Sequence, residues 1–316
     1  MHSLLPGYRL PLCSGNMSGR YYTCGVLNGI ITAISYGTNP LFAMPMIMAG
    51  IGVSSILFYR YFFAALIYGA LLVLVKKRSL RITLREFVPL LYLSLLFSFS
   101  SITLFSSFRY IDVGISCTVL FVYPSLVAII SAVFYGERLS GVVMGAIALA
   151  TMGVVFLSRG SPEAPLNLTG LLLVLSSALL YALYIIGVRQ MKSIRRLRSE
   201  KLNFYVMLFG LIVYVCNLRF GADLQVLSSP LLWGCAILLA IIPTIVSLET
   251  LTVAIKLIGA TRASILGALE PLTAIIVGVS LFGEVLTWRI FVGFLLIISG
   301  VILIVSQRKK SASRSA

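Results

Sequence analysis

The sequence predicts an all-α, polytopic membrane protein with ten transmembrane helices arranged as two inverted five-helix repeats. Hydrophobic residues make up 59% of the 316 residues and charged residues only 11%, and the mean hydropathy is +1.06. Apolar runs of about twenty residues recur along the chain, each long enough to cross roughly 30 Å of hydrocarbon as a helix. Backbone groups in lipid must be satisfied within their own segment, so helices are expected for these runs. One long stretch of the chain also occurs twice.

We expect the spans to begin at several recognisable helix signals. Thr83 and Glu86 have the spacing of a capping box, which predicts a helix start before Phe87. Ser140 and Thr287 are predicted N-caps of the fifth and tenth helices. The ten predicted spans are 22–43, 53–75, 86–107, 114–135, 140–158, 169–189, 202–218, 231–255, 260–282 and 288–306.

The duplicated stretch covers residues 108–157 and 255–304, which align without a gap at a shift of 147 residues. Matches between aliphatic residues mean little in so apolar a chain, whereas matched prolines, glycines and glutamates are informative. The informative pairs are Pro124 with Pro271, Gly136–Glu137 with Gly283–Glu284, and Gly153 with Gly300. Each copy therefore reads as a helical hairpin with a proline in its first helix. We interpret Glu137 and Glu284 as acceptors of hydrogen bonds at the hairpin turns.

The repeat extends more weakly toward the start of each half, where Tyr36 matches Tyr181 when Gly25 is set on Gly170. Each half then has five spans, so the second half crosses the membrane in the opposite sense. Such inverted repeats are typical of secondary transporters. The predicted organisation is a disordered N-terminal tail (1–21, with Met1 or Met17 as the start), a first repeat (22–158), a linker (159–168), a second repeat (169–306) and a basic C-terminal tail (307–316).

Basic residues indicate the orientation of the chain. With both termini in the cytoplasm, twenty Lys and Arg residues lie inside and four lie outside, namely Arg109, Arg159, Arg219 and Arg289. The positive-inside rule therefore predicts a multi-pass protein of the cell membrane with both termini cytoplasmic. The formal net charge of +16 belongs to this pattern and does not predict a nucleic-acid partner. The sequence indicates no particular oligomeric state.

Catalytic and metal-binding chemistry is not expected. The only histidine is His2, and the five cysteines show no metal-ligand spacing. We therefore predict no metal site, no cofactor and no enzymatic activity. A membrane enzyme acting on lipid-linked substrates is a weaker alternative, since it would need a nucleophile, a base or a metal cluster near the interface.

Several features together resemble a known family. They are the five-plus-five duplication, the proline-centred helix followed by Gly-Glu, and the two stretches Phe105-Ser-Ser-Phe-Arg-Tyr-Ile and Leu251-Thr-Val-Ala-Ile-Lys-Leu-Ile-Gly-Ala. Residues 22–306 resemble the drug/metabolite transporter superfamily, and within it the EamA-type transporters. The resemblance implies ten helices around a central cavity and the transport of small metabolites.

Ionisable residues inside spans are candidate functional residues because burying charge in a membrane is costly. Arg60 lies in the second span and can bind a substrate carboxylate or phosphate, snorkel outward, or pair with a structural glutamate. Glu270 precedes Pro271 and is a candidate proton carrier or cation ligand; alternatively it is a packed, hydrogen-bonded residue. Glu249, past Pro243, is a second coupling candidate with a structural alternative.

Polar groups near the same depth are candidates for lining the cavity. The predicted substrate-binding set is Arg60, Glu270, Tyr36, Tyr123, Tyr181 and Asn28, and Asn39 before Pro40 is also at this level. Pro124 and Pro271 are predicted to kink the fourth and ninth helices, and interrupted spans at corresponding positions point to a transporter's binding site.

The predicted function is secondary transport of a small organic solute, a metabolite or amino-acid-like molecule, by alternating access around a cavity at mid-membrane. We expect an exporter, with protons as a possible coupling ion and the lipid bilayer as the surrounding partner. The alternative is a lipid or glycolipid flippase, or a membrane subunit that does not transport.

Overall fold

The computed structural model describes residues 17–77, 79–111, 116, 119–137, 139–158, 167–273, 276 and 288–312. Most of these residues are helical, the rest form turns and loops, and there is no strand among them. Five helical segments of the described chain are long and apolar enough to cross a membrane: Val53–Val75, Leu84–Ser107, Leu168–Gln190, Ser199–Asn217 and Pro230–Ile258. Helical residues occur in each of the ten predicted ranges, and the predicted all-α membrane fold is confirmed.

The first half contains α1 (Met17–Gly37), α2 (Asn39–Met48), α3 (Val53–Ala70) continued by the π-helix η1 (Leu71–Val75), α4 (Leu84–Ser107), α6 (Tyr123–Tyr135) and α7 (Gly141–Ser158). The second half contains α8 (Leu168–Gln190), α9 (Lys192–Arg196), α10 (Ser199–Asn217), η2 (Arg219–Gly221), α11 (Pro230–Ala240), the π-helix η3 (Ile241–Val246), α12 (Ser247–Ile258), α13 (Ala260–Leu266) and α15 (Trp288–Ala312).

Helix starts follow the local sequence. Thr83 and Glu86 form the predicted capping box at the start of α4, in which the Thr83 amide donates to Glu86 Oε2 at 2.9 Å. Ser140 precedes α7, and its Oγ accepts a hydrogen bond from the Val143 amide at 3.4 Å. The other predicted N-cap, Thr287, and the pair Gly283–Glu284 lie outside the described residues.

Glu137 takes a partner other than the expected hairpin turn. Its Oε2 accepts a hydrogen bond from Thr261 Oγ1 at 3.2 Å, across to α13 in the other half. The prediction placed its hydrogen bonds within the turn and the start of the following helix. The structure therefore uses this carboxylate to connect the two halves.

The last helices of the two halves pack reciprocally. A Cβ atom on Gly153 of α7 would lie 2.7 Å from the Gly293 carbonyl oxygen and from Ile297 of α15. A Cβ on Gly300 of α15 would lie 2.9 Å from the Ala146 carbonyl oxygen of α7. Residues 146 and 293, like 153 and 300, are separated by the repeat shift of 147. The two glycines therefore occupy equivalent places in one pseudo-twofold contact.

A second reciprocal contact joins the first helix of each half to the other half. A Cβ on Gly25 would meet Leu257 and Ile258, whereas a Cβ on Gly170 would meet Tyr110 and Ile111. These two target pairs are again separated by 147 residues. Accordingly α1 packs on α12 and α8 packs on α4.

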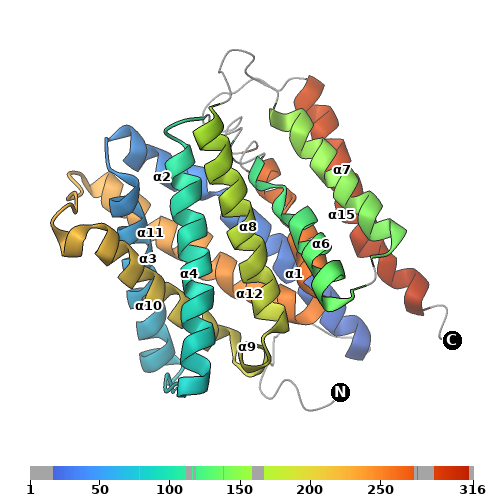
Figure 1. The fold of residues 1–316 in the computed structure, drawn as a ribbon, viewed down its shortest axis with the longest axis horizontal. Helices are drawn as coiled ribbons and strands as arrows, with labels where there is room; N and C mark the ends of the chain where they lie inside the picture. The colour runs from blue at the N-terminus through green and yellow to red at the C-terminus, as the bar shows by residue number, and fades with distance from the viewer. Residues whose placement is uncertain are drawn as a thin grey trace.

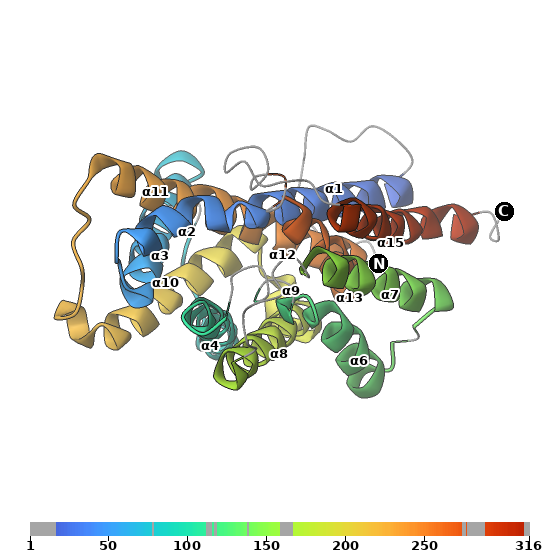
Figure 2. The same ribbon diagram turned by 90° about the horizontal axis from the view of Figure 1, so that it is seen from above.

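Equivalent helices run in opposite directions. In Figure 1, α7 and α15 lie side by side at one edge of the molecule and are antiparallel, and Figure 2 shows the same pair from above. The helices α4 and α8 also lie side by side in the middle of the molecule. The antiparallel course of the repeat-related pair and the reciprocal glycine contacts together confirm the inverted repeat.

Two predicted continuous helices are interrupted. The expected span 114–135 contains a turn at Phe121–Val122, after which α6 begins with Pro124 in its first turn. The expected span 260–282 contains a turn at Gly267–Ala268, after which helix resumes at 269–273 with Pro271 near its start. Pro124 and Pro271 were predicted to bend continuous helices. This prediction was wrong, because each proline instead lies near the start of a new helical segment. Proline has no backbone N–H. It fits the first turn of a helix because an N–H at that position would have no hydrogen-bond partner within the helix.

The first span is also longer and more broken than predicted. Helix α1 ends at Gly37, and α2 begins at Asn39 with Pro40 in its first turn, so the expected 22–43 helix is two segments. Gly37 allows the approach of the second half, because a Cβ there would lie 2.5 Å from the Glu270 carbonyl oxygen. The breaks at residues 38, 121 and 267 define the region described next.

Candidate functional site

A cavity of about 60 Å³ lies beside the helix breaks. Its walls come from the α1–α2 break, the last turn of α4, and the interrupted fourth and ninth spans. The lining residues that carry polar or aromatic groups are Tyr36, Asn39, Phe105, Phe108, Phe121, Tyr123 and Glu270. The cavity therefore combines aromatic walls with one carboxyl group among the described lining residues.

Glu270 is almost fully buried beside this cavity. The residue is 9% exposed, and Tyr123, its repeat counterpart, lines the same cavity. The Tyr123 hydroxyl donates to the Ser264 carbonyl oxygen at 3.3 Å. Gly267 leaves the space for this hydroxyl, since a Cβ there would lie 1.8 Å from it. The break at Gly267–Ala268 thus places two repeat-related residues beside the same cavity.

Asn39 contributes a second polar group to the lining. Its Oδ1 is buried and has no hydrogen-bond partner among the described residues. An unsatisfied buried acceptor is costly, so it is usually paired with a protein group, water or ligand. The cavity therefore presents an amide oxygen and a carboxyl group to any molecule that enters it.

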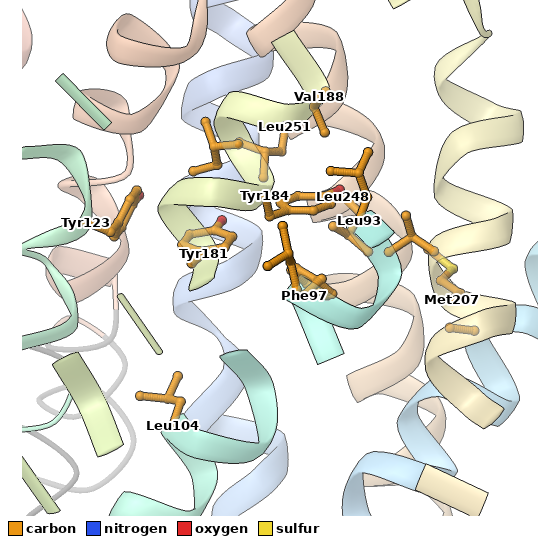
Figure 3. Close-up of a cluster of buried hydrophobic side chains, with 14 of the residues drawn as sticks. Leu93, Phe97, Leu104, Tyr123, Tyr181, Tyr184, Val188, Met207, Leu248 and Leu251 are labelled. Carbon is orange, nitrogen blue, oxygen red and sulfur yellow. The ribbon is translucent and has the colours of Figure 1, made fainter. Parts of the chain in front are cut away.

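A layer of aromatic rings adjoins the cavity. Tyr36 stacks on Tyr181 with ring centroids 6.4 Å apart, and Tyr181 stacks on Tyr184 at 6.3 Å. Tyr123 packs edge-on against Tyr181 at 4.8 Å. Figure 3 shows Tyr123, Tyr181 and Tyr184 in a row, with Phe97 beside them. The structure thus brings together the predicted residues Tyr36, Tyr123, Tyr181 and Glu270.

Arg60 lies next to this region and does not line the cavity. The side chain is fully buried, its Nε donates to Thr244 Oγ1 at 2.6 Å, and Nη2 donates to the Pro243 carbonyl oxygen at 3.2 Å. Both acceptors belong to the π-helix η3, where Pro243 interrupts the regular hydrogen bonds. The described residues show neither of the two predicted alternatives for Arg60, a side chain that snorkels outward or an ion pair with a glutamate.

The charge of Arg60 is only partly matched. No described carboxylate forms an ion pair with it, and its Nη1 has no hydrogen-bond partner among the described residues. Its guanidinium carbon lies 5.9 Å from the ring centroid of Tyr36. Tyr36 therefore has the arginine near its ring and also lines the cavity that contains Glu270.

Glu249 belongs to a different cluster and lies in the first turn of α12. Its Oε2 accepts hydrogen bonds from the Tyr68 hydroxyl and from Asn203 Nδ2, both at 2.7 Å. Thr252 Oγ1 donates to Asn203 Oδ1 at 2.8 Å, which completes a buried network. Lys256, two turns further along α12, donates from Nζ to the Leu197 carbonyl oxygen at 2.6 Å.

Asn28 is also placed away from the cavity. Its Nδ2 donates to the Cys24 carbonyl oxygen of its own helix at 2.8 Å. Of the residues that surround these sites, Thr244, Tyr68 and Asn203 carried no signal in the sequence. These residues matter because they contact residues of distant spans. The partners in Arg60–Thr244 and in Tyr68–Glu249 are more than 180 residues apart in the sequence, and helical periodicity does not reveal such contacts.

Asn203→Ala is expected to lower stability, because Glu249 loses one of two donors and Thr252 loses its acceptor. Leaving such groups unsatisfied costs about 1–3 kcal/mol. Thermal unfolding of the purified protein in detergent would measure the change. Asn28→Ala serves as the control, since its side chain bonds only within α1 among the contacts described above. Equal melting temperatures for the two variants would contradict the importance of the network.

An all-helical, two-repeat membrane fold, with broken helices around an aromatic-walled cavity that contains a carboxyl group, defines a class of membrane transport proteins. The profile of the EamA-like transporter family matches residues 23–159 and 168–306. The chain belongs to the EamA-like transporter family, and it is a membrane transporter by that membership.

Individual relatives agree with this assignment. Two uncharacterized transporters of Archaeoglobus fulgidus are similar to the chain. One is 30% identical over 195 residues, covering 61% of this chain and 67% of the relative, and the other is 27% identical over 204 residues, covering 63% and 70%. A solved crystal structure superposes with a TM-score of 0.72 at 18% identity over 89% of this chain and 96% of its own. That likeness supports the fold.

Proposed function

We propose that this protein is a secondary transporter that exchanges a small, ammonium-bearing organic solute, of amino-acid-like character, for protons through the Glu270 cavity. The observation that carries the proposal is that Glu270 and Asn39 line the same aromatic-walled cavity, and that Asn39 Oδ1 has no hydrogen-bond partner among the described residues. Both groups can accept hydrogen bonds from an ammonium group, and the tyrosine and phenylalanine rings attract cations through their faces.

Arg60 suggests the other end of the solute. A buried guanidinium with a free Nη1 and no described carboxylate partner is suited to a substrate carboxylate. Tyr36 lies between this group and the cavity that holds Glu270. A solute with an ammonium and a carboxylate would reach both charges once the Tyr36 ring moves. This geometry supports an amino-acid-like solute over a simple cation.

The described conformation is contracted around the site. A cavity of about 60 Å³ holds only a few water molecules, whereas ligand pockets typically measure about 300–1,000 Å³. Substrate entry therefore requires the broken segments to separate. Because the breaks at residues 121 and 267 occur at corresponding places in the two halves, we propose alternating access by rocking of one half against the other, with export as the direction.

Counterflow in proteoliposomes tests the proposal. Vesicles preloaded with amino acids should accumulate the labelled compound, and an imposed proton gradient should change the rate. Arg60→Lys should retain exchange better than Arg60→Gln, because only lysine keeps a positive charge. Absence of exchange across zwitterions, amines and carboxylates would reject the proposal. Binding of an amphipathic lipid without solute flux would instead favour a flippase or a non-transporting subunit.

We propose that both termini and the basic loops face the cytoplasm of the cell membrane. The two basic loops lie together, since Lys76 pairs with Glu200, and Lys201 pairs with Glu86 at 3.2 Å. In a cysteine-free background, Ser79→Cys is expected to react with an impermeant maleimide only from the inside of right-side-out vesicles. Asp223→Cys, in the loop after η2, is the control expected to react from the outside. The reversed pattern would contradict this orientation.

A further inference from the structure

A second and larger cavity, of about 440 Å³, lies on the basic side of the protein. One wall is the segment after η1, which contributes Lys77 and Ser79, and the other is the turn from α9 into α10. The charged residues of the lining are Lys77, Arg196, Arg198, Glu200 and Lys201. Four are basic and one is acidic, so the lining carries an excess of positive charge.

Ion pairs account for only part of this charge. Glu200 pairs with Lys76, and Lys201 pairs with Glu86 at 3.2 Å. Each of these contacts matches one cation with one carboxylate. Lys77, Arg196 and Arg198 form no ion pair with any residue that the structure describes, and all three are exposed. Three cations are therefore available at one cavity.

The walls of this basic cavity are fixed by hydrogen bonds from the spans. The Tyr205 hydroxyl of α10 donates to the Leu80 carbonyl oxygen and fastens the first wall. Lys256 Nζ of α12 donates to the Leu197 carbonyl oxygen at 2.6 Å and fastens the second wall. Ile194 of α9 is fully buried. The cations are thus presented by anchored segments.

The start of α10 adds to the positive potential. This helix has 19 residues, and its N-cap Arg198 provides no side-chain hydrogen bond to the first turn. Free amides at a helix N-terminus favour anions, and phosphate groups above all. Leu72, Leu80 and Leu197 line the rest of the cavity, which gives it an apolar wall next to the cations.

We propose that the basic cavity binds a phosphate group, supplied either by a phospholipid headgroup of the adjoining leaflet or by a soluble phosphate. Arginine and lysine both bind phosphate oxygens, arginine in a bidentate manner. Basic pockets at the cytoplasmic ends of membrane helices recognise anionic headgroups, and the leucines suit the first carbons of a lipid. The site lies apart from the transport cavity, because the two share no lining residue.

Binding of phosphatidic acid to the full-length protein in phosphatidylcholine nanodiscs tests the proposal, with inorganic phosphate titrated onto detergent-solubilised protein as a second arm. Arg196→Gln/Arg198→Gln should weaken binding by about tenfold or more, and Lys77→Gln should act in the same direction. Lys192→Gln/Arg195→Gln is the matched control, because it removes two exposed charges of α9, the helix that contains Arg196, outside the cavity lining. Gel filtration and thermal unfolding verify that each variant is folded.

The two arms identify the source of the phosphate. Lipid binding that is lost in the cavity variants and retained in the control supports a headgroup site. Binding of inorganic phosphate alone, with the same dependence on the cavity residues, supports a soluble ligand. Equal losses in the cavity and control variants would show general surface attraction and overturn the site, as would the absence of binding in both arms.

Discussion

Glu270→Gln is expected to reduce proton-driven solute exchange by about 100-fold or more while leaving membrane insertion intact. Glutamine is nearly isosteric with glutamate but cannot release or take up a proton, and it presents an amide donor where an ammonium group would bind. A loss of this size corresponds to about 2.7 kcal/mol. Initial rates in proteoliposomes with and without an imposed pH gradient would measure it.

Glu137→Gln is the matched control for that experiment. Glu137 is a carboxylate near a helix end that accepts a hydrogen bond from Thr261, and it does not line the transport cavity. Its replacement should leave the pH dependence of exchange unchanged. If Glu270→Gln kept full proton-driven exchange, Glu270 would no longer be a coupling residue, and Asn39 Oδ1 would have to act with another group.

Gly153→Leu is expected to disrupt the contact between α7 and α15. A Cβ at this position would lie 2.7 Å from a backbone oxygen, and a backbone atom cannot move aside as a flexible side chain can. Overpacking of this kind costs about 1–3 kcal/mol or more, and small residues are what allow membrane helices to approach closely. Thermal unfolding in detergent and the folded yield would measure the loss.

The repeat supplies both a partner and a control for this substitution. Gly300→Leu should destabilise the protein by a similar amount, since Gly300 has the equivalent contact with Ala146. Gly145→Leu should have little effect, because nothing lies within 4 Å of a Cβ at that position of the same helix. A Gly145 variant as unstable as the Gly153 variant would show that added bulk anywhere on α7, and not the crossing, determines the result, because leucine is a better helix former than glycine.

The sequence predicted those features that repeat along the chain or depend on near neighbours. The capping box of Thr83 and Glu86 is local, and it is present. The matched glycines and prolines indicated the duplication, and the structure adds that Gly153 and Gly300 occupy equivalent contacts. Hydropathy located the helices because apolar length is the main requirement for crossing a bilayer.

Features that depend on contacts between distant spans were predicted less well. Arg60 was placed within a span, where the structure has it in α3, yet its partners Thr244 and Pro243 lie in a π-helix that no local pattern indicates. Asn28 was included on polarity alone, and its amide is satisfied by its own helix. Pro124 and Pro271 indicated interruptions, but whether a proline bends a helix or begins one depends on how neighbouring spans satisfy the free backbone groups.

The reciprocal crossing of α7 and α15 has a thermodynamic consequence for the proposed cycle. Suppose that the two halves exchange their conformations during the cycle. The contacts of this crossing are then the same before and after the exchange, so the crossing contributes equally to the free energies of the states open to either side. The free-energy difference between those states must then come from positions where the copies differ, such as Glu270 against Tyr123 and Gly267 against Leu120. A protein built this way sets the resting direction of its opening through the positions at which its two copies differ.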